Sequence, residues 1–285
     1  MQAMDRLAEC IGGALGRQLR EKGGGISELR IRAGRPSALC MMDGTKVPSE
    51  TIAAENFRRI LARLMGDSLY ACEEELKQGY FTMEGGIRVG VCGRLNAASG
   101  SVTSMAGVGS LCIRIPREIR NSTAGQLWHG SPESMLILSP PGMGKTTLVR
   151  EIARLASEDG YNVAIADERR EIAACREGIP QFDLGPNTDV MDGCPKAIAM
   201  ELLLRACAPQ MIVADEIGGE ADAAAIRDAA RCGAAVVATA HAASFVDAEN
   251  RFRGLFQEGI FCRAVLLGPE PGRINSVREY GSEGE

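Results

Sequence analysis

The chain has 285 residues, of which 45% are hydrophobic and 24% are charged, and its formal net charge is −5. These values are typical of a soluble globular protein and leave room for one large domain or two ordinary ones. No apolar run approaches the length of a membrane span, and the first residues lack the layout of a signal peptide. We therefore expect a cytoplasmic protein with no membrane insertion of its own, which can still dock on a membrane partner.

The cysteine pattern bears on whether the chain holds a zinc site, and the charge pattern bears on what its arginines contact. Ten cysteines are scattered without a C-x-x-C pair and only two histidines are present, so reduced thiols used as small core residues are favoured over a zinc site. Residues 1–125 carry 17 Lys and Arg against 13 Asp and Glu, whereas residues 126–285 carry 15 against 24. This asymmetry indicates that some N-terminal arginines face phosphate or an acidic neighbour, although an ordinary solvated surface explains most of them.

Residues 1–125 are predicted to form a small α+β domain. An amphipathic helix over residues 1–22 ends at three glycines, and two strands follow over residues 26–32 and 37–42. The remaining elements expected in this domain are a helix over 53–65, a shorter helix over 69–77, a hairpin over 79–95 that turns at 84–86, a Gly/Ser/Ala-rich loop over 96–110 and a strand over 111–116. Residues 116–128 are expected to connect this domain to the next.

Residues 126–285 alternate strands and helices, which is the pattern of an α/β domain built on a parallel sheet. The predicted strands cover residues 135–138, 162–166, 211–214, 235–240 and 264–267. The predicted helices cover residues 145–157, 195–207, 221–232 and 245–256. Residues 281–285 form a Gly/Glu-rich tail that is expected to be disordered.

The most specific motif follows the first of these strands. It reads Ser139-Pro140-Pro141-Gly142-Met143-Gly144-Lys145-Thr146-Thr147 and leads directly into a helix, which is the context of a G-x-x-x-x-G-K-[ST] phosphate-binding loop. Loop N–H groups and the positive end of the helix favour an anion, Lys145 adds charge for the β- and γ-phosphates, and Thr146 offers a hydroxyl to Mg²⁺. Ser139 replaces the first glycine of the motif. The loop predicts binding of a nucleoside triphosphate with Mg²⁺.

Carboxylates follow two other predicted strands. Asp215 and Glu216 end the strand at 211–214, where Asp215 is expected to hold Mg²⁺ through water and Glu216 to polarise the attacking water. Glu168, after the strand at 162–166, is an alternative base, and Arg169 beside it could contact phosphate or belong to a solvated helix start. His241 ends a further strand and is either a polar sensor at the nucleotide or a structural residue.

Together these segments resemble the stage III sporulation protein AA family, relatives of the type II and type IV secretion ATPases. The resemblance rests on the residues from Pro140 to Arg150, Asp167-Glu168-Arg169, Glu171-Ile172-Ala173, Ile179-Pro180-Gln181, the residues from Thr188 to Lys196, Leu203-Leu204-Arg205, Ala208-Pro209, Asp215-Glu216-Ile217-Gly218 and Thr239-Ala240-His241, and on the stretches 28–36 and 109–116. It implies a RecA-like P-loop NTPase domain at residues 126–285, preceded by the smaller domain at 1–125.

The resemblance also implies a hexameric ring that binds ATP between its domains and works with an integral membrane platform protein. Glu168 matches the acidic box of these ATPases, Glu216 the Walker B glutamate and His241 the histidine box. Arg205 fits the Leu-Arg that precedes the Walker B strand. Arg88, Arg94 and Arg114 lie where N-terminal-domain arginines reach the phosphates of a neighbouring site, and all three carry over only loosely.

These expectations favour a Mg²⁺-dependent ATPase, peripheral on the cytoplasmic face of a membrane, that energises assembly of or transport through a sporulation channel. One alternative is a nucleic-acid-dependent ring translocase, which the negative net charge and the aromatic content of 4% disfavour. Another is a nucleotide-gated scaffold that hardly hydrolyses ATP, against which the carboxylates Asp215, Glu216 and Glu168 argue.

Overall fold

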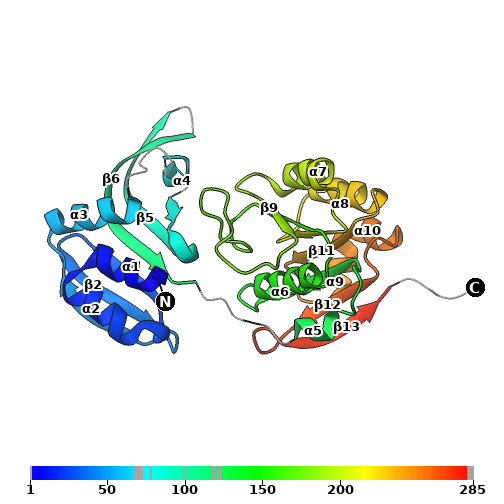
Figure 1. Ribbon diagram of the computed structural model, residues 1–285, viewed down its shortest axis with the longest axis horizontal. Coiled ribbons are helices and arrows are strands. Elements are labelled where there is room, and N and C mark those ends of the chain that lie inside the picture. Colours follow the sequence, from blue (N-terminus) through cyan, green and yellow to red (C-terminus); the bar gives the residue numbers. More distant parts are fainter. Residues whose placement is uncertain are drawn as a thin grey trace, which may run out of the picture. The chain divides into compact units, whose positions relative to one another are not determined.

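The computed structural model describes residues 2–66, 73–77, 79–98, 101–116, 120 and 123–280. The chain divides into two compact units, Met1–Arg117 and Glu118–Glu285, each with its own sheet (Figure 1). The sequence-based boundary after residue 125 stays a prediction, and α5 (Ala124–Leu127) already contributes Ala124 and Leu127 to the core of the second unit. Among the described helices, none combines the length and apolar character needed to cross a bilayer.

The first unit is an antiparallel sheet covered by helices. Its strands lie in the order β3-β2-β1-β6-β5-β4. Leu7, Leu15 and Phe57 from the helices pack with Leu29 and Ile113 from the strands in one core. The elements are α1 (Gln2–Ile11), α2 (Gly13–Lys22), a 3₁₀ turn (Gly23–Gly25), β1 (Ile26–Arg32), β2 (Arg35–Met41), β3 (Lys46–Thr51), α3 (Ala54–Met65), α4 (Glu73–Lys77), β4 (Tyr80–Thr82), a 3₁₀ turn (Glu84–Gly86), β5 (Arg88–Ala98) and β6 (Ser101–Arg114).

Two predictions for this unit are wrong. The helix expected over 1–22 is two helices, because Gly12 and Gly13 adopt φ of 64° and 62°, outside the helical region. The loop expected over 96–110 is, in its described residues 96–98 and 101–110, a continuation of β5 and β6, which pair as a long antiparallel ribbon. Small residues permit this pairing: a Cβ at Gly93 would lie 1.8 Å from the Gly107 carbonyl oxygen. The strand β3 was not expected, and of the helix predicted over 69–77 the part before Glu73 lies outside the described residues.

The second unit is built on a seven-stranded sheet of order β13-β12-β7-β11-β10-β8-β9, parallel except at β13. The strands are β7 (Met135–Leu138), β8 (Val163–Asp167), β9 (Thr188–Asp192), β10 (Met211–Ala214), β11 (Ala235–Ala240), β12 (Arg263–Leu267) and β13 (Ile274–Glu279). The helices after α5 are α6 (Lys145–Glu158), α7 (Lys196–Cys207), α8 (Glu220–Arg231), α9 (Phe245–Arg251) and α10 (Arg253–Gln257).

Alternate residues of the central strands point to opposite faces and fill two separate cores. Leu136 and Ile212 pack with α7, α8, α9 and α10 on one face, whereas Ile137 and Val213 pack with α6 on the other. This is a three-layer α/β arrangement, in which buried parallel strands are uniformly apolar. The five predicted strands and the helices at α6, α7 and α8 are present, while the helix expected over 245–256 is two helices.

The parallel order has one consequence for function. β7, β11, β10 and β8 are four consecutive strands of the sheet and run in one direction, so their carboxyl ends lie along one edge. The segments that begin with Ser139, Glu168, Asp215 and His241 leave these strands there. Ligands of open α/β sheets bind at this edge.

Candidate functional site

The loop between β7 and α6 has the backbone that the phosphate-binding motif predicts. Gly142 and Gly144 adopt φ of 78° and 85°, a region that residues with a side chain rarely enter. A Cβ at Gly144 would lie only 3.1 Å from the amide nitrogen of Gly272, whose N–H donates to the Met143 carbonyl at 2.9 Å. Gly144 is therefore required both by its own conformation and by the turn between β12 and β13.

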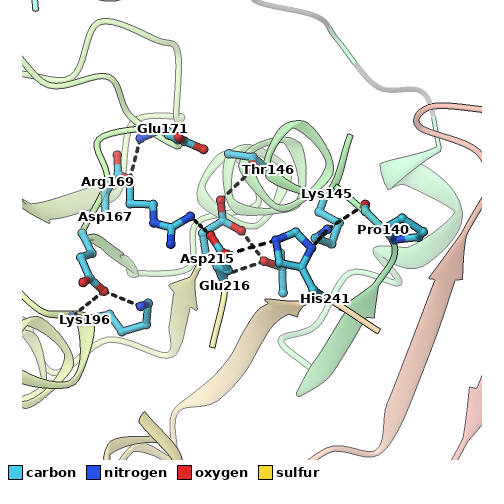
Figure 2. Close-up of polar contacts among 12 residues, drawn as sticks. Pro140, Lys145, Thr146, Asp167, Arg169, Glu171, Lys196, Asp215, Glu216 and His241 are labelled. Atoms are coloured by element: carbon cyan, nitrogen blue, oxygen red, sulfur yellow. Dashed lines mark hydrogen bonds and ion pairs between the residues drawn. The ribbon is translucent and has the colours of Figure 1, made fainter. Parts of the chain in front are cut away.

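Lys145, the first residue of α6, folds back over this loop. Its ammonium donates to the carbonyl and the hydroxyl oxygen of Ser139, at 2.9 and 3.1 Å, and to the Pro140 carbonyl at 3.2 Å. Nδ1 of His241 lies 3.1 Å from the same ammonium (Figure 2). Burial lowers the pKa of Lys145, and the nearby charge of Asp215 opposes that shift. The hydroxyl of the serine that replaces the first glycine thus adds an acceptor that a glycine would not supply.

Asp215, directly after β10, accepts hydrogen bonds from side chains of α6 and β11. The Thr146 hydroxyl donates to Oδ2 of Asp215 at 2.6 Å, and the Thr239 hydroxyl donates to Oδ1. Thr239, a fully buried residue of β11, also accepts the N–H of Glu216 at 2.7 Å. One threonine hydroxyl therefore fixes two consecutive acidic residues.

Glu216 is held by Arg169 on one side and by His241 on the other. Its backbone lies in the left-handed region, with φ of 54°, and its carboxylate forms an ion pair with Arg169. The other carboxylate oxygen lies 3.0 Å from Nε2 of His241. Because Nδ1 of His241 accepts from Lys145, this network assigns the imidazole proton to Nε2, which donates to Glu216. His241 thus links Lys145 to Glu216.

These side chains surround one open cavity of about 430 Å³. Its volume is within the range of small-ligand pockets. Ser139 and Pro140 do not line the cavity but accept hydrogen bonds from Lys145. The residues that line the cavity are Pro141, Gly142, Met143, Gly144, Lys145, Thr146, Thr147, Arg169, Glu171, Asp215, Glu216 and His241.

Besides Ser139 and Pro140, two predicted site residues of the second unit, Glu168 and Arg205, do not line this cavity. Glu168 forms an ion pair with Lys196; burial of its carboxyl acts to raise its pKa, but the hydrogen bonds and charge of Lys196 prevail and hold the pKa of Glu168 below its ordinary value. Arg205 is exposed on α7 and pairs with Glu201. Arg114 belongs to the first unit, where it lies 3.7 Å from Glu28. The catalytic or binding roles assigned to Glu168, Arg205 and Arg114 stay predictions.

Two buried residues organise the segment after β8 in a way that sequence reasoning missed. Asp167 accepts the N–H groups of Glu171, Ile172 and Ala173 at 2.8 to 3.2 Å. Burial raises the pKa of Asp167, and these backbone hydrogen bonds oppose the shift. Arg150 of α6 donates to the carbonyls of Glu171 and Ile172. An acidic residue at the end of a wholly apolar strand is the signal that could have revealed this anchor.

The donor set at the cavity fits Mg²⁺. Thr146 and Asp215 supply a hydroxyl and a carboxylate, oxygen ligands of the kind that Mg²⁺ accepts in small number while phosphates and waters complete its shell. Within the described part of the chain, no group of three or more His, Cys, Asp or Glu side chains could hold a metal by itself. A metal here would therefore be shared with the phosphates of a nucleotide.

Comparisons with known proteins agree with this architecture. Stage III sporulation protein AA of Bacillus subtilis (strain 168) is 38% identical over 271 residues, covering 91% of this chain and 88% of that protein. The pilus retraction motor PilT with bound ADP has a TM-score of 0.58 at 19% identity, covering 88% of this chain and 76% of that one. The ATPase DotB of Legionella pneumophila has a TM-score of 0.56 at 14% identity, covering 88% and 75%.

The two structural likenesses confirm the predicted fold, an antiparallel N-terminal sheet followed by a mostly parallel sheet as in secretion ATPases. The resemblance seen in the sequence is confirmed as well. The family model described as "Sporulation stage III, protein AA" matches residues 3–284, nearly the whole chain. The chain therefore belongs to the sporulation stage III, protein AA family.

Proposed function

We propose that this chain is a Mg²⁺-dependent ATPase that acts as a ring-forming motor in sporulation. The observation that carries the proposal is the convergence of Lys145, Thr146, Asp215 and Glu216 on one cavity at the carboxyl edge of a parallel sheet. A cation, a hydroxyl and two carboxylates are the parts that phosphate-loop hydrolases use to bind and cleave a nucleoside triphosphate.

The reaction would be attack of water on the terminal phosphorus, with cleavage of its bond to the bridging oxygen and release of ADP and phosphate. The loop amides from Gly142 to Thr146 and the N-terminus of α6 would bind the phosphates. Lys145 would exchange the Ser139 and Pro140 oxygens for phosphate oxygens. Glu216 would take the proton of the attacking water, and His241 would hold the Glu216 carboxylate in place. Mg²⁺, held by Thr146 and Asp215, would neutralise charge on the phosphates.

The larger assembly is part of the proposal. The family match and the likeness of the fold to PilT and DotB support a ring of subunits, of which six is the expected number. In such a ring Arg114 would reach the phosphates of a neighbouring subunit. The ring would sit on the cytoplasmic face of a membrane, against an integral platform protein, and would energise assembly of or transport through a sporulation channel.

Steady-state phosphate release tests the enzymatic part of the proposal. Wild-type protein should release phosphate from ATP only with Mg²⁺, and Lys145→Ala should abolish turnover while its far-UV circular dichroism stays that of the wild type. Turnover that survives Lys145→Ala would contradict the assignment of the loop. The oligomeric mass of the wild type and of Glu216→Gln, with and without ATP, tests the ring.

A further inference from the structure

Arg169 is the one residue of the segment after β8 whose cationic side chain lines the phosphate cavity. Its guanidinium reaches toward Glu216, with which it forms an ion pair (Figure 2). The side chain remains 59% exposed, so no packing holds it on this partner. An exposed cation therefore stands at the cavity beside the carboxylate proposed to activate water.

The residues on either side of Arg169 are tied to other elements. Glu168 pairs with Lys196 at the start of α7, and Arg170 pairs with Asp192 at the end of β9, at 2.5 Å. The carboxylate of Asp167 accepts hydrogen bonds from the backbone N–H groups of residues 171–173. The backbone at Arg169 is thus fixed from both sides while its side chain can change partner.

The strength of the present ion pair decides whether such an exchange is possible. The ion pair is weakened by water and salt that reach it from the exposed side of Arg169, although Glu216 itself is only 28% exposed. A phosphate group carries more charge than a carboxylate and offers oxygens that match the fork of a guanidinium. A terminal phosphate in the cavity would therefore displace Glu216 from Arg169, and Glu216 would keep its contact with His241.

We propose that Arg169 is a phosphate sensor that exchanges Glu216 for the terminal phosphate of a bound nucleoside triphosphate. The exchange distinguishes a triphosphate from a diphosphate and frees Glu216 from its ion pair only when the triphosphate is present. Glu168 and Arg170 are the anchors that aim Arg169, so Glu168 positions the sensor and is not the base. This inference rests on the proposed function.

Calorimetric titration of the full chain with ATPγS and with ADP, each with Mg²⁺, tests the inference. Loss of one charge-assisted contact to phosphate should weaken ATPγS binding to Arg169→Ala by about tenfold. ADP, which lacks the terminal phosphate, should bind within about twofold of the wild type. Arg169→Lys keeps the charge but not the fork and should fall between the two.

The matched control is Arg231→Ala, which removes an exposed arginine that pairs with Asp228 on α8 and should leave both affinities unchanged. Equal weakening of ATPγS and ADP by Arg169→Ala, or no change in either, would overturn the sensor. Wild-type protein that binds neither nucleotide would instead remove the proposed function, and the sensor with it.

Discussion

Replacement of Thr239 tests whether its hydroxyl holds the two acidic residues Asp215 and Glu216 in place. Its buried hydroxyl donates to Asp215 and accepts the Glu216 N–H at 2.7 Å. Thr239→Val keeps the volume of the side chain but removes both hydrogen bonds. Loss of a bond to a carboxylate and an N–H left without its acceptor together cost about 2–4 kcal/mol of unfolding free energy. The left-handed backbone of Glu216 also loses a contact that holds it.

Thr239→Ser is the matched control, because it keeps the hydroxyl and loses one buried methyl group, worth about 1 kcal/mol. Urea unfolding followed by circular dichroism measures stability, and phosphate release measures the effect on the site. Because misplaced catalytic groups are costly, we expect Thr239→Val to lose at least about tenfold in kcat and Thr239→Ser to stay near the wild type. Equal stability and activity of the two variants would refute the role given to the hydroxyl.

Three further predictions test the anchors and the loop. The double variant Glu168→Lys/Lys196→Glu exchanges the two partners and restores their ion pair, so it should regain at least part of the ATP turnover that Glu168→Lys loses. A double variant that is completely inactive at wild-type stability would instead make Glu168 the base. Because the pKa of Glu168 is lowered in the folded protein, its stabilisation is present above about pH 4.3 and is lost as the pH falls through the lowered pKa. Urea unfolding should therefore show the wild type to be more stable than Glu168→Gln by up to about 1 kcal/mol at pH 7, a small value because the carboxyl is 38% exposed. The difference in stability should shrink below about pH 5, and a difference independent of pH would contradict the stabilising ion pair. Gly144→Ala and Gly160→Ala both force a side chain into positive φ, and both variants should lose stability. Only Gly144→Ala, at the cavity, should lose nucleotide binding in the calorimetric titration. Loss of binding in both variants would point to global damage.

The second unit was predictable because its strands are short, apolar and separated by helical periodicity. β7, β8, β10 and β11 each read as a buried parallel strand. β9 was missed because it is the edge strand Thr188–Asp192, partly exposed and with only two apolar residues between polar ones. The ribbon of β5 and β6 was missed for a different reason: its small residues favour a loop locally, and only pairing with the opposite strand makes them a sheet.

Within the candidate site, the sequence pattern placed the loop at residues 139–147 and the carboxylates Asp215 and Glu216 directly after strands, which is where the structure has them; their roles stay predictions. Sequence could not show that Lys145 rests on Ser139, that Thr239 joins Asp215 to Glu216, or that Glu168 turns to Lys196 while Arg169 faces the cavity. The first depends on the fold of the loop itself, and the contacts of Thr239 and Arg169 with the residues after β10 depend on which strands are neighbours in the sheet. The order β7-β11-β10-β8 is set by long-range packing, which no local pattern in the chain contains.

The most direct test of the central claim is a crystal structure of the chain with Mg²⁺ and a non-hydrolysable ATP analogue. The account predicts the phosphates on the loop between β7 and α6, the Lys145 ammonium moved from Ser139 onto phosphate, and the metal at Thr146 and Asp215. A nucleotide bound elsewhere, or Lys145 still bonded to Ser139 and Pro140 beside a bound nucleotide, would contradict it.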